Sequence, residues 1–306
     1  MSRIYDALQR ADMERRSTQE SESAGAAEPD FLSGAAQMPA IHPGIVLDQI
    51  TRYPWHPSAL ALPTLGDRGE SIEQFRALRS QIYQQGSQAS LKTILVSSGM
   101  PAEGKTFVAA NLAMSLARNQ DNTVLLIDAD LRFPALHAIL GAPNLPGLSE
   151  FLAGTAQVND ILQRSQSSQF IESGIVREIP NLTFIPAGAG GDSSSELVTN
   201  HRIEELIELL SPHFDWIVID SPPVLAFADA IDLARAADAV LLVARGGVTS
   251  FEVAQRSQTA FSNSRILGFV LNAVRETPRN DSYYYYYQKE EAGSGLHGHK
   301  NMGRKG

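Results

Sequence analysis

The feature that most constrains this chain is a glycine-containing loop between an apolar run and a helical pattern. The loop fits G-x-x-x-x-G-K-[ST], follows the apolar run 93–96 and precedes the helical pattern 105–118. Its residues are Gly99, Met100, Pro101, Ala102, Glu103, Gly104, Lys105 and Thr106. Between a strand and a helix, the backbone N–H groups of such a loop point toward an anion. The chain therefore carries a predicted phosphate site.

The sequence after this loop alternates short apolar runs with helical patterns. The expected strands cover 93–96, 124–127, 182–185, 216–219, 239–243 and 266–271, and the expected helices cover 71–85, 105–118, 196–210, 225–236 and 250–261. Continuous apolar strands that alternate with helices predict an α/β fold, with a mostly parallel sheet and helices on both faces. Ligands of such sheets bind at the carboxyl ends of the strands.

Acidic residues end two of these strands. Asp128 and Asp130 follow the run 124–127, and Asp220 follows 216–219. One such aspartate alone would be a helix cap or an ion-pair partner, but three near one phosphate loop favour metal–nucleotide chemistry. We expect Lys105 to bridge the β- and γ-phosphates of ATP and Thr106 to place its hydroxyl on Mg²⁺. Asp128 and Asp220 are further candidate metal ligands, and either can accept a proton.

Charge and composition exclude several classes of protein. The chain has 306 residues, a net charge of −9 and only five lysines, which argues against a general nucleic-acid binder. It has no cysteine, which excludes disulfides, thiolate metal sites and thiol catalysis. Its apolar runs fall far below the roughly 20 residues that span a bilayer, and no secretory signal is apparent, so we expect a cytoplasmic protein.

The organisation along the chain is uneven. Residues 1–16 have a helical pattern, and 17–70 are rich in Ser, Ala, Gly, Glu and Pro, which predicts a flexible linker. The P-loop domain is expected over 71–275. The remaining 276–306 are polar and Gly-rich apart from one tyrosine block, which predicts a disordered tail.

Three segments together resemble the Walker-type motifs of bacterial tyrosine kinases, the autokinases of capsule and exopolysaccharide systems. These segments are SSGMPAEGKT (97–106), IDADLRFP (127–134) and VIDSPP (218–223). The resemblance covers roughly residues 70–290 and implies a P-loop NTPase of the deviant Walker, partition-ATPase-like type. Partition ATPases usually carry a second lysine where this chain has Met100, which favours the kinase branch. The family usually has Gly at Ala102; if the backbone there needs a positive φ, alanine costs about 1–2 kcal/mol.

The resemblance assigns further residues. Glu73, Arg76 and Arg79 are similar to the family's E-x-x-R-x-x-R oligomerisation motif, although their spacing alone is typical of a solvated helix face. Asn272, at the end of the last strand, corresponds to a residue that hydrogen-bonds adenine, or it is a strand-ending turn residue. Lys105, Asp128, Asp130 and Asp220 are the expected catalytic residues, with Asp128 as the base.

Five consecutive tyrosines lie near the C-terminus: Tyr283, Tyr284, Tyr285, Tyr286 and Tyr287. The polar residues around them cannot build a core over this block. The block is then either a sticky edge or docking patch, or a mobile substrate tail. A tethered tail gives each tyrosine a high effective concentration at a neighbouring active site. We interpret these tyrosines as the phosphoacceptors.

The resemblance implies a Mg-ATP-dependent tyrosine autokinase that regulates polymerisation and export of an exopolysaccharide or capsule. It also implies a homo-oligomer, a separate transmembrane chain-length-determinant or adaptor protein, a cognate tyrosine phosphatase, and a position at the inner face of the plasma membrane. A P-loop ATPase of the partition or positioning type, without kinase activity, is the alternative. A nucleotide-binding scaffold without turnover is a further alternative.

Overall fold

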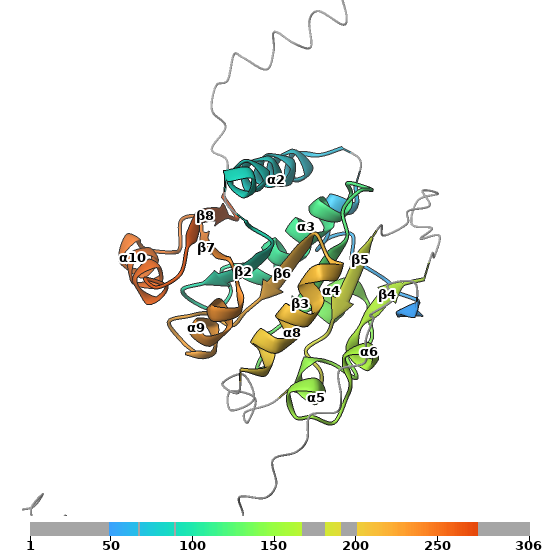
Figure 1. The fold of residues 1–306 in the computed structure, drawn as a ribbon. Helices are drawn as coiled ribbons and strands as arrows, with labels where there is room; N and C mark the ends of the chain where they lie inside the picture. The colour runs from blue at the N-terminus through green and yellow to red at the C-terminus, as the bar shows by residue number, and fades with distance from the viewer. Residues whose placement is uncertain (1–48, 67, 89, 167–180, 191–200, 275–306) are drawn as a thin grey trace, which may run out of the picture. The chain divides into compact units, whose positions relative to one another are not determined.

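The apolar runs form the strands of one sheet in the computed structural model, which describes residues 49–66, 68–88, 90–166, 181–190 and 201–274 (Figure 1). The sheet order in this part of the chain is β1-β4-β5-β3-β6-β2-β7-β8. Its neighbours pair in parallel except β4 with β5, so the predicted mostly parallel sheet is confirmed. The strands are β1 (Thr51–Tyr53), β2 (Thr93–Ser98), β3 (Val124–Asp128), β4 (Gln163–Ser165), β5 (Leu182–Ile185), β6 (Trp216–Asp220), β7 (Ala239–Arg245) and β8 (Ile266–Asn272).

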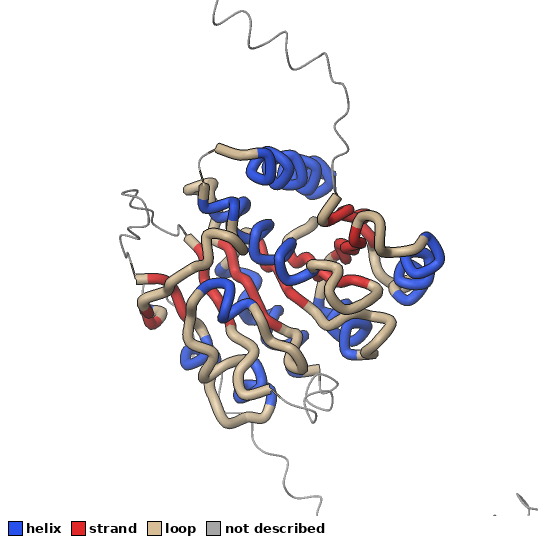
Figure 2. Tube along the Cα trace, turned by 180° about the vertical axis from the view of Figure 1, so that it is seen from behind, coloured by secondary structure: helices blue, strands red, loops and turns tan. Residues whose placement is uncertain are grey.

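Helices pack on both faces of this sheet, as Figures 1 and 2 show from opposite sides. The described α-helices are α2 (Glu70–Gln88), α3 (Lys105–Ala117), α4 (Leu136–Leu140), α5 (Leu148–Leu152), α6 (Val158–Ile161), α8 (Arg202–Leu210), α9 (Asp229–Leu233) and α10 (Phe251–Ala260). Short 3-10 turns cover η2 (Pro63–Leu65), η3 (Ser211–His213) and η4 (Ala234–Ala236).

The strands alternate between two hydrophobic cores because successive side chains of a strand point to opposite faces. In β3, Leu125 and Ile127 pack with residues of α5, α8 and α9, whereas Val124 and Leu126 pack with residues of α2, α3 and α4. All four side chains are fully buried. Both faces of the central strands are therefore covered, which explains why their sequences are continuously apolar.

The structure differs from the expected linker over residues 49–66. Strand β1 pairs with β4, and the side chains of Trp55 and Leu62 are fully buried. Trp55 packs edge-on against Phe184, and the Thr64 hydroxyl donates to Asn111 Oδ1 at 2.7 Å. Because prolines and small polar residues surround these two large apolar side chains, the composition of the segment predicted a linker. Residues 1–48, with the expected helix at 1–16, lie outside the described residues.

The expected helix over 225–236 is also different. Only α9 and the 3-10 turn η4 are helical there. The preceding backbone is tied to β2 and the P-loop instead: Val224 N–H donates to Ser98 O at 2.8 Å and Leu225 N–H to Gly99 O at 3.2 Å. Tertiary hydrogen bonds have here replaced the first turns of a helix. Among the described helices, none is both long and apolar enough to cross a membrane.

Candidate active site

Three neighbouring strands place the phosphate loop and the acidic residues together. Strand β6 lies between β2 and β3, and Asp220 pairs in register with Val96 on one side and with Asp128 on the other. Parallel strands end at the same edge of the sheet, so the loop after β2 meets the ends of β3 and β6. The expected convergence of Lys105 with Asp128, Asp130 and Asp220 therefore follows directly from the strand order.

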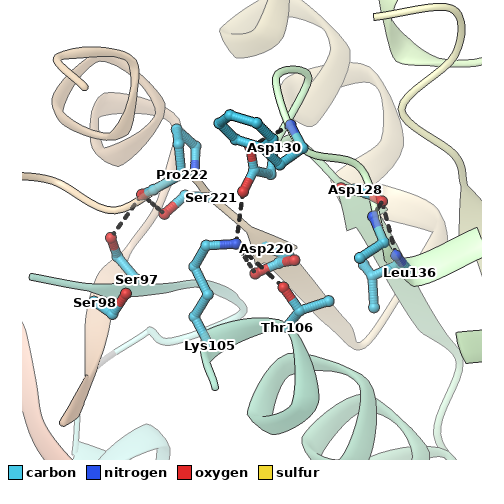
Figure 3. A network of polar contacts seen from close by, with 12 residues as sticks. Ser97, Ser98, Lys105, Thr106, Asp128, Asp130, Leu136, Asp220, Ser221 and Pro222 are labelled. Atoms are coloured by element: carbon cyan, nitrogen blue, oxygen red, sulfur yellow. Dashed lines mark hydrogen bonds and ion pairs between the residues drawn. The ribbon is translucent and has the colours of Figure 1, made fainter. Parts of the chain in front are cut away.

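Lys105 lies at the centre of this cluster (Figure 3). Its ammonium Nζ is 2.7 Å from Asp130 Oδ2 and 3.7 Å from Asp220 Oδ1, and it donates to Thr106 Oγ1 at 3.1 Å. The other oxygen of Asp130 accepts the Phe133 N–H at 3.1 Å. The lysine expected to bridge two phosphates thus has Asp130 as its anionic partner in this structure.

Asp128 and Asp220 are fully buried and incompletely bonded. Oδ2 of Asp128 accepts the N–H groups of Ala135 and Leu136 at 3.2 and 3.0 Å, and Figure 3 shows its carboxylate turned toward Leu136. Among the described residues, Oδ1 of Asp128 and both oxygens of Asp220 have no hydrogen-bond partner. Buried polar atoms rarely remain in this condition unless a ligand or a function uses them.

Burial and mutual repulsion shift the titration of these groups. Burial, and then the Asp220 charge, raise the pKa of Asp128 well above its ordinary value. Burial raises the pKa of Asp220 to about 6, although the Lys105 charge and the Thr106 hydroxyl act in the opposite direction. For Lys105, burial alone lowers the pKa, but the charges of Asp220 and Asp130 outweigh it, so the pKa is raised. The lysine is therefore a permanent cation at neutral pH.

These residues fit the magnesium ion that P-loop proteins use. The Thr106 hydroxyl and the bare oxygens of Asp220 and Asp128 are hard oxygen donors. No group of three or more acidic, His or Cys side chains forms a complete cation cage in the part of the chain that is described. In proteins Mg²⁺ is usually held by one or two carboxylates together with water and substrate phosphates.

The phosphate loop has a strained backbone. Ala102 has φ of +63° and Gly104 has φ of +95°, so the position at which the family usually has glycine does need a left-handed conformation. Alanine there costs about 1–2 kcal/mol. A side chain at Gly104 would clash with the Asn272 amide. The positive φ therefore favours glycine at this second position, and any larger residue would also have to displace the Asn272 amide from the Glu103 carbonyl.

Glu103 holds the loop from within. Its side chain is buried; Oε2 accepts the Met100 N–H at 2.8 Å and Oε1 accepts the Thr249 hydroxyl. The Met100 amide is thus already used, and Pro101 has no N–H, so the amides free to face an anion begin at Ala102. The loop residues were all expected to bind ATP, but the structure gives Met100 and the Glu103 side chain a supporting position.

Residues after β7 and β8 complete this support. Arg245 Nη1 donates to the Ala102 carbonyl at 3.0 Å, and its N–H donates to Thr249 Oγ1 at 2.8 Å. Asn272 Nδ2 donates to the Glu103 carbonyl at 3.0 Å. Asn272 thus contacts the loop backbone, and its expected contact with adenine stays a prediction. Arg245 and Thr249 were not among the residues expected from the sequence, although the rule that sites follow strand ends points to Arg245.

The remaining expected residues lie away from this cluster. On α2, exposed Glu73 and Arg76 form an ion pair of 2.5 Å with each other. Half-buried Arg79 donates to the Ser115 carbonyl of α3 at 2.6 Å, so it also ties α2 to its own domain. The five tyrosines, 283–287, lie outside the described residues.

Comparisons with known proteins agree with this arrangement. The family described as "AAA domain" matches residues 91–256. The tyrosine-protein kinase ptk of Acinetobacter johnsonii is 32% identical over 68% of this chain and 27% of its own length. This chain therefore spans about a quarter of the length of the curated relatives it matches.

Two solved structures are similar in both sequence and fold. The kinase domain of the Escherichia coli tyrosine kinase ETK has a TM-score of 0.63 and 28% identity, over 76% of this chain and 85% of that domain. The kinase domain of VpsO has a TM-score of 0.54 and 30% identity, over 68% of this chain and all of that domain. On this evidence of sequence, fold and site, the chain belongs to the bacterial tyrosine kinase family, within the AAA-type P-loop NTPases.

Proposed function

We propose that this chain is a Mg-ATP-dependent protein-tyrosine kinase that transfers the γ-phosphoryl group of ATP to Tyr283–Tyr287 of a neighbouring subunit. The observation that carries the proposal is the convergence of one lysine and three aspartates on a P-loop. Membership of the kinase family and the acceptor tyrosines of the same chain support it.

Lys105 and the loop amides bind and orient the triphosphate. The lysine lies beside Asp130 and is buried and charged. A phosphate anion would compete with Asp130 for this ammonium. Fixed positive groups placed where charge develops are the main source of catalysis in phosphoryl transfer. Thr106 and Asp220 would hold Mg²⁺, which neutralises phosphate charge when bound, and Asp128 Oδ1 is then left to accept a proton.

Asp128 is the candidate base. A tyrosine hydroxyl has a pKa near 10, so at neutral pH it must lose a proton as its oxygen attacks. The bond between that oxygen and the γ-phosphorus forms, the bond from phosphorus to the β–γ bridging oxygen breaks, and ADP leaves with the electron pair. The proton passes to Asp128, whose Oδ1 has no partner and whose raised pKa suits a general base.

The wider role follows from charge. Each phosphotyrosine adds about −1.5 to −2 charges, so progressive phosphorylation of the tail repels an already acidic protein. We infer that this weakens a homo-oligomer assembled through Glu73, Arg76 and Arg79. Similarity to the bacterial tyrosine kinases, and not the charge, supports the rest of the proposal: the switch would regulate exopolysaccharide or capsule polymerisation and export, with a separate transmembrane adaptor at the plasma membrane and a phosphatase that resets it.

Incubation of the purified chain with Mg-ATP, followed by mass spectrometry of the tail, tests the transfer. Phosphate on Tyr283–Tyr287 that disappears in Lys105→Met supports the kinase. Native mass spectrometry of Lys105→Met against phosphorylated wild type tests the oligomer: equal subunit counts would reject that part.

The second candidate is a P-loop ATPase of the partition or positioning type. The same cluster could activate water instead of tyrosine, and the fold is shared. Met100 argues against it, because its half-exposed side chain occupies the position of the second lysine of such ATPases. Release of free phosphate with unmodified tyrosines would favour the ATPase.

A further inference from the structure

An exposed aromatic side chain lies beside the transfer site and takes no part in the chemistry proposed above. Phe133, in the loop after β3, is 68% exposed, and its own N–H donates to Asp130. Asp130 in turn holds the ammonium of Lys105. Asp130 therefore links the backbone of Phe133 to the ammonium that is proposed to meet the phosphates.

The support beneath Phe133 is built from fixed contacts. Its ring packs at a tilt against Phe227, with centroids 6.3 Å apart. The guanidinium of Arg132 stacks over the Phe227 ring, 4.5 Å from its centroid. The Nε of Arg132 is 3.0 Å from the buried carboxylate of Asp229. We call Phe133, Phe227 and the Arg132–Asp229 pair the aromatic rim.

We propose that the aromatic rim is the docking surface for the tyrosine block 283–287, and that Phe133 is its specificity-determining residue. This inference rests on the proposed kinase activity and deepens it by naming what recognises the acceptor. A tyrosine that brings its hydroxyl to the phosphate beside Lys105 must lay its sequence neighbours over the surrounding rim.

The chemistry of the occupant matches the rim. In this chain the neighbours of an acceptor tyrosine are themselves tyrosines. Aromatic pairs in offset or edge-to-face contact gain about 0.5–1.5 kcal/mol beyond the burial of their area. A run of five identical rings also lets the block shift by one residue and keep the same contact, so successive tyrosines can be presented to one site.

A mixing experiment tests the docking surface. Full-length Lys105→Met serves as the acceptor and a chain with intact Lys105 as the donor, and mass spectrometry follows phosphate on the acceptor's tyrosines. With Phe133→Ala in the donor, the initial rate falls about five- to tenfold, whereas Phe133→Trp stays within about twofold of wild type. The same Phe133→Ala change placed in the acceptor chain leaves the rate unchanged.

Two controls separate recognition from damage to the site. The Kd of Mg-ADP, measured by calorimetry, stays at the wild-type value in Phe133→Ala. Phe251→Ala, which removes an 82% exposed ring at the start of α10, leaves transfer unchanged.

Other results would overturn the inference. An unaltered transfer rate with Phe133→Ala in the donor would mean that something else covers the rim, and an equal loss of Mg-ADP affinity would mean that the P-loop is disturbed. If wild type transfers no phosphate at all, the proposed function fails before the rim is tested, so the two failures are distinguishable.

Discussion

The two sides of the phosphate loop are built in opposite ways. On the side of β7 and β8, Glu103, Thr249, Arg245 and Asn272 satisfy one another and the loop backbone. On the side of β3 and β6, three buried oxygens, Oδ1 of Asp128 and both of Asp220, have no hydrogen-bond partner among the described residues, and the two carboxylates repel each other. On the side of β7 and β8 these hydrogen bonds fix the shape of the loop. The side of β3 and β6 stores unfavourable electrostatics that Mg²⁺ and nucleotide would relieve, as is usual for functional sites.

The largest effect is expected where the two sides meet, at Lys105. Replacing it with methionine removes the cation that faces the phosphates while keeping much of the apolar stem. The rate of tyrosine phosphorylation should fall by at least about 10²- to 10³-fold, measured by phosphate incorporation at saturating Mg-ATP. A residual rate within tenfold of wild type would contradict the proposed role of the ammonium.

On the side of β3 and β6, Asp220→Asn should change stability and activity in opposite directions. The transfer rate falls about a hundredfold, because a candidate metal ligand is lost. The unfolding free energy at pH 7.5 rises, because burial lifts the folded-state pKa of Asp220 from 3.8 to about 6 and its ionisation therefore costs stability. That pKa shift sets an upper value of roughly 3 kcal/mol on the gain in unfolding free energy.

The pH dependence of this stability gain tests whether ionisation of Asp220 is its cause. The protonated acid is favoured in the folded protein, so the cost is absent below the unfolded pKa and develops as pH rises from about 4 through about 6. Thermal unfolding of the nucleotide-free proteins should show the variant more stable by a few degrees at pH 7.5 and equal to wild type near pH 4. A gain that persists at pH 4 would point to packing instead.

Thr249→Val tests the hydrogen bonds on the side of β7 and β8. It keeps the shape of the side chain but leaves Glu103 Oε1 and the Arg245 N–H without this hydroxyl. We expect the Kd of Mg-ADP to rise about tenfold, or roughly 1.4 kcal/mol, with kcat at saturating ATP nearly unchanged.

Thr249→Ser should restore the affinity, because it restores the hydroxyl. Thr259→Val is the matched control, since among the described residues that hydroxyl donates to the Gln255 carbonyl of its own helix. Equal weakening by both valine variants would deny that the P-loop contact matters.

Ala102→Gly should give the smallest effect and the opposite sign. It relieves the positive φ of the loop but adds freedom to the unfolded chain, so the net gain in unfolding free energy is about 0.5–1 kcal/mol. Ala77→Gly at an exposed position of α2 should cost about 1 kcal/mol, which makes chemical denaturation of the pair a test of backbone conformation alone. A loss of stability in both would show that Ala102 is not strained.

Much of the fold was predictable because the strands are buried on both faces. Runs such as 124–127 are apolar without interruption, and only a covered parallel sheet accommodates them in a chain that alternates with helices. The segment around Trp55 and the turn before α9 were not predictable. Their structure depends on partners far away in the sequence, Phe184 for the first and Gly99 for the second.

The sequence by itself determined the phosphate loop, the acidic strand ends and the edge of the sheet at which they meet. Those depend on local pattern and on the rule that parallel strands end together. Only the tertiary structure decided that Lys105 is held by Asp130, that Glu103 faces Thr249, and that Ala102 takes a left-handed backbone. These side-chain contacts join loops of different strands, and no local periodicity links Lys105 with Asp130, 25 positions later, or Glu103 with Thr249, 146 positions later.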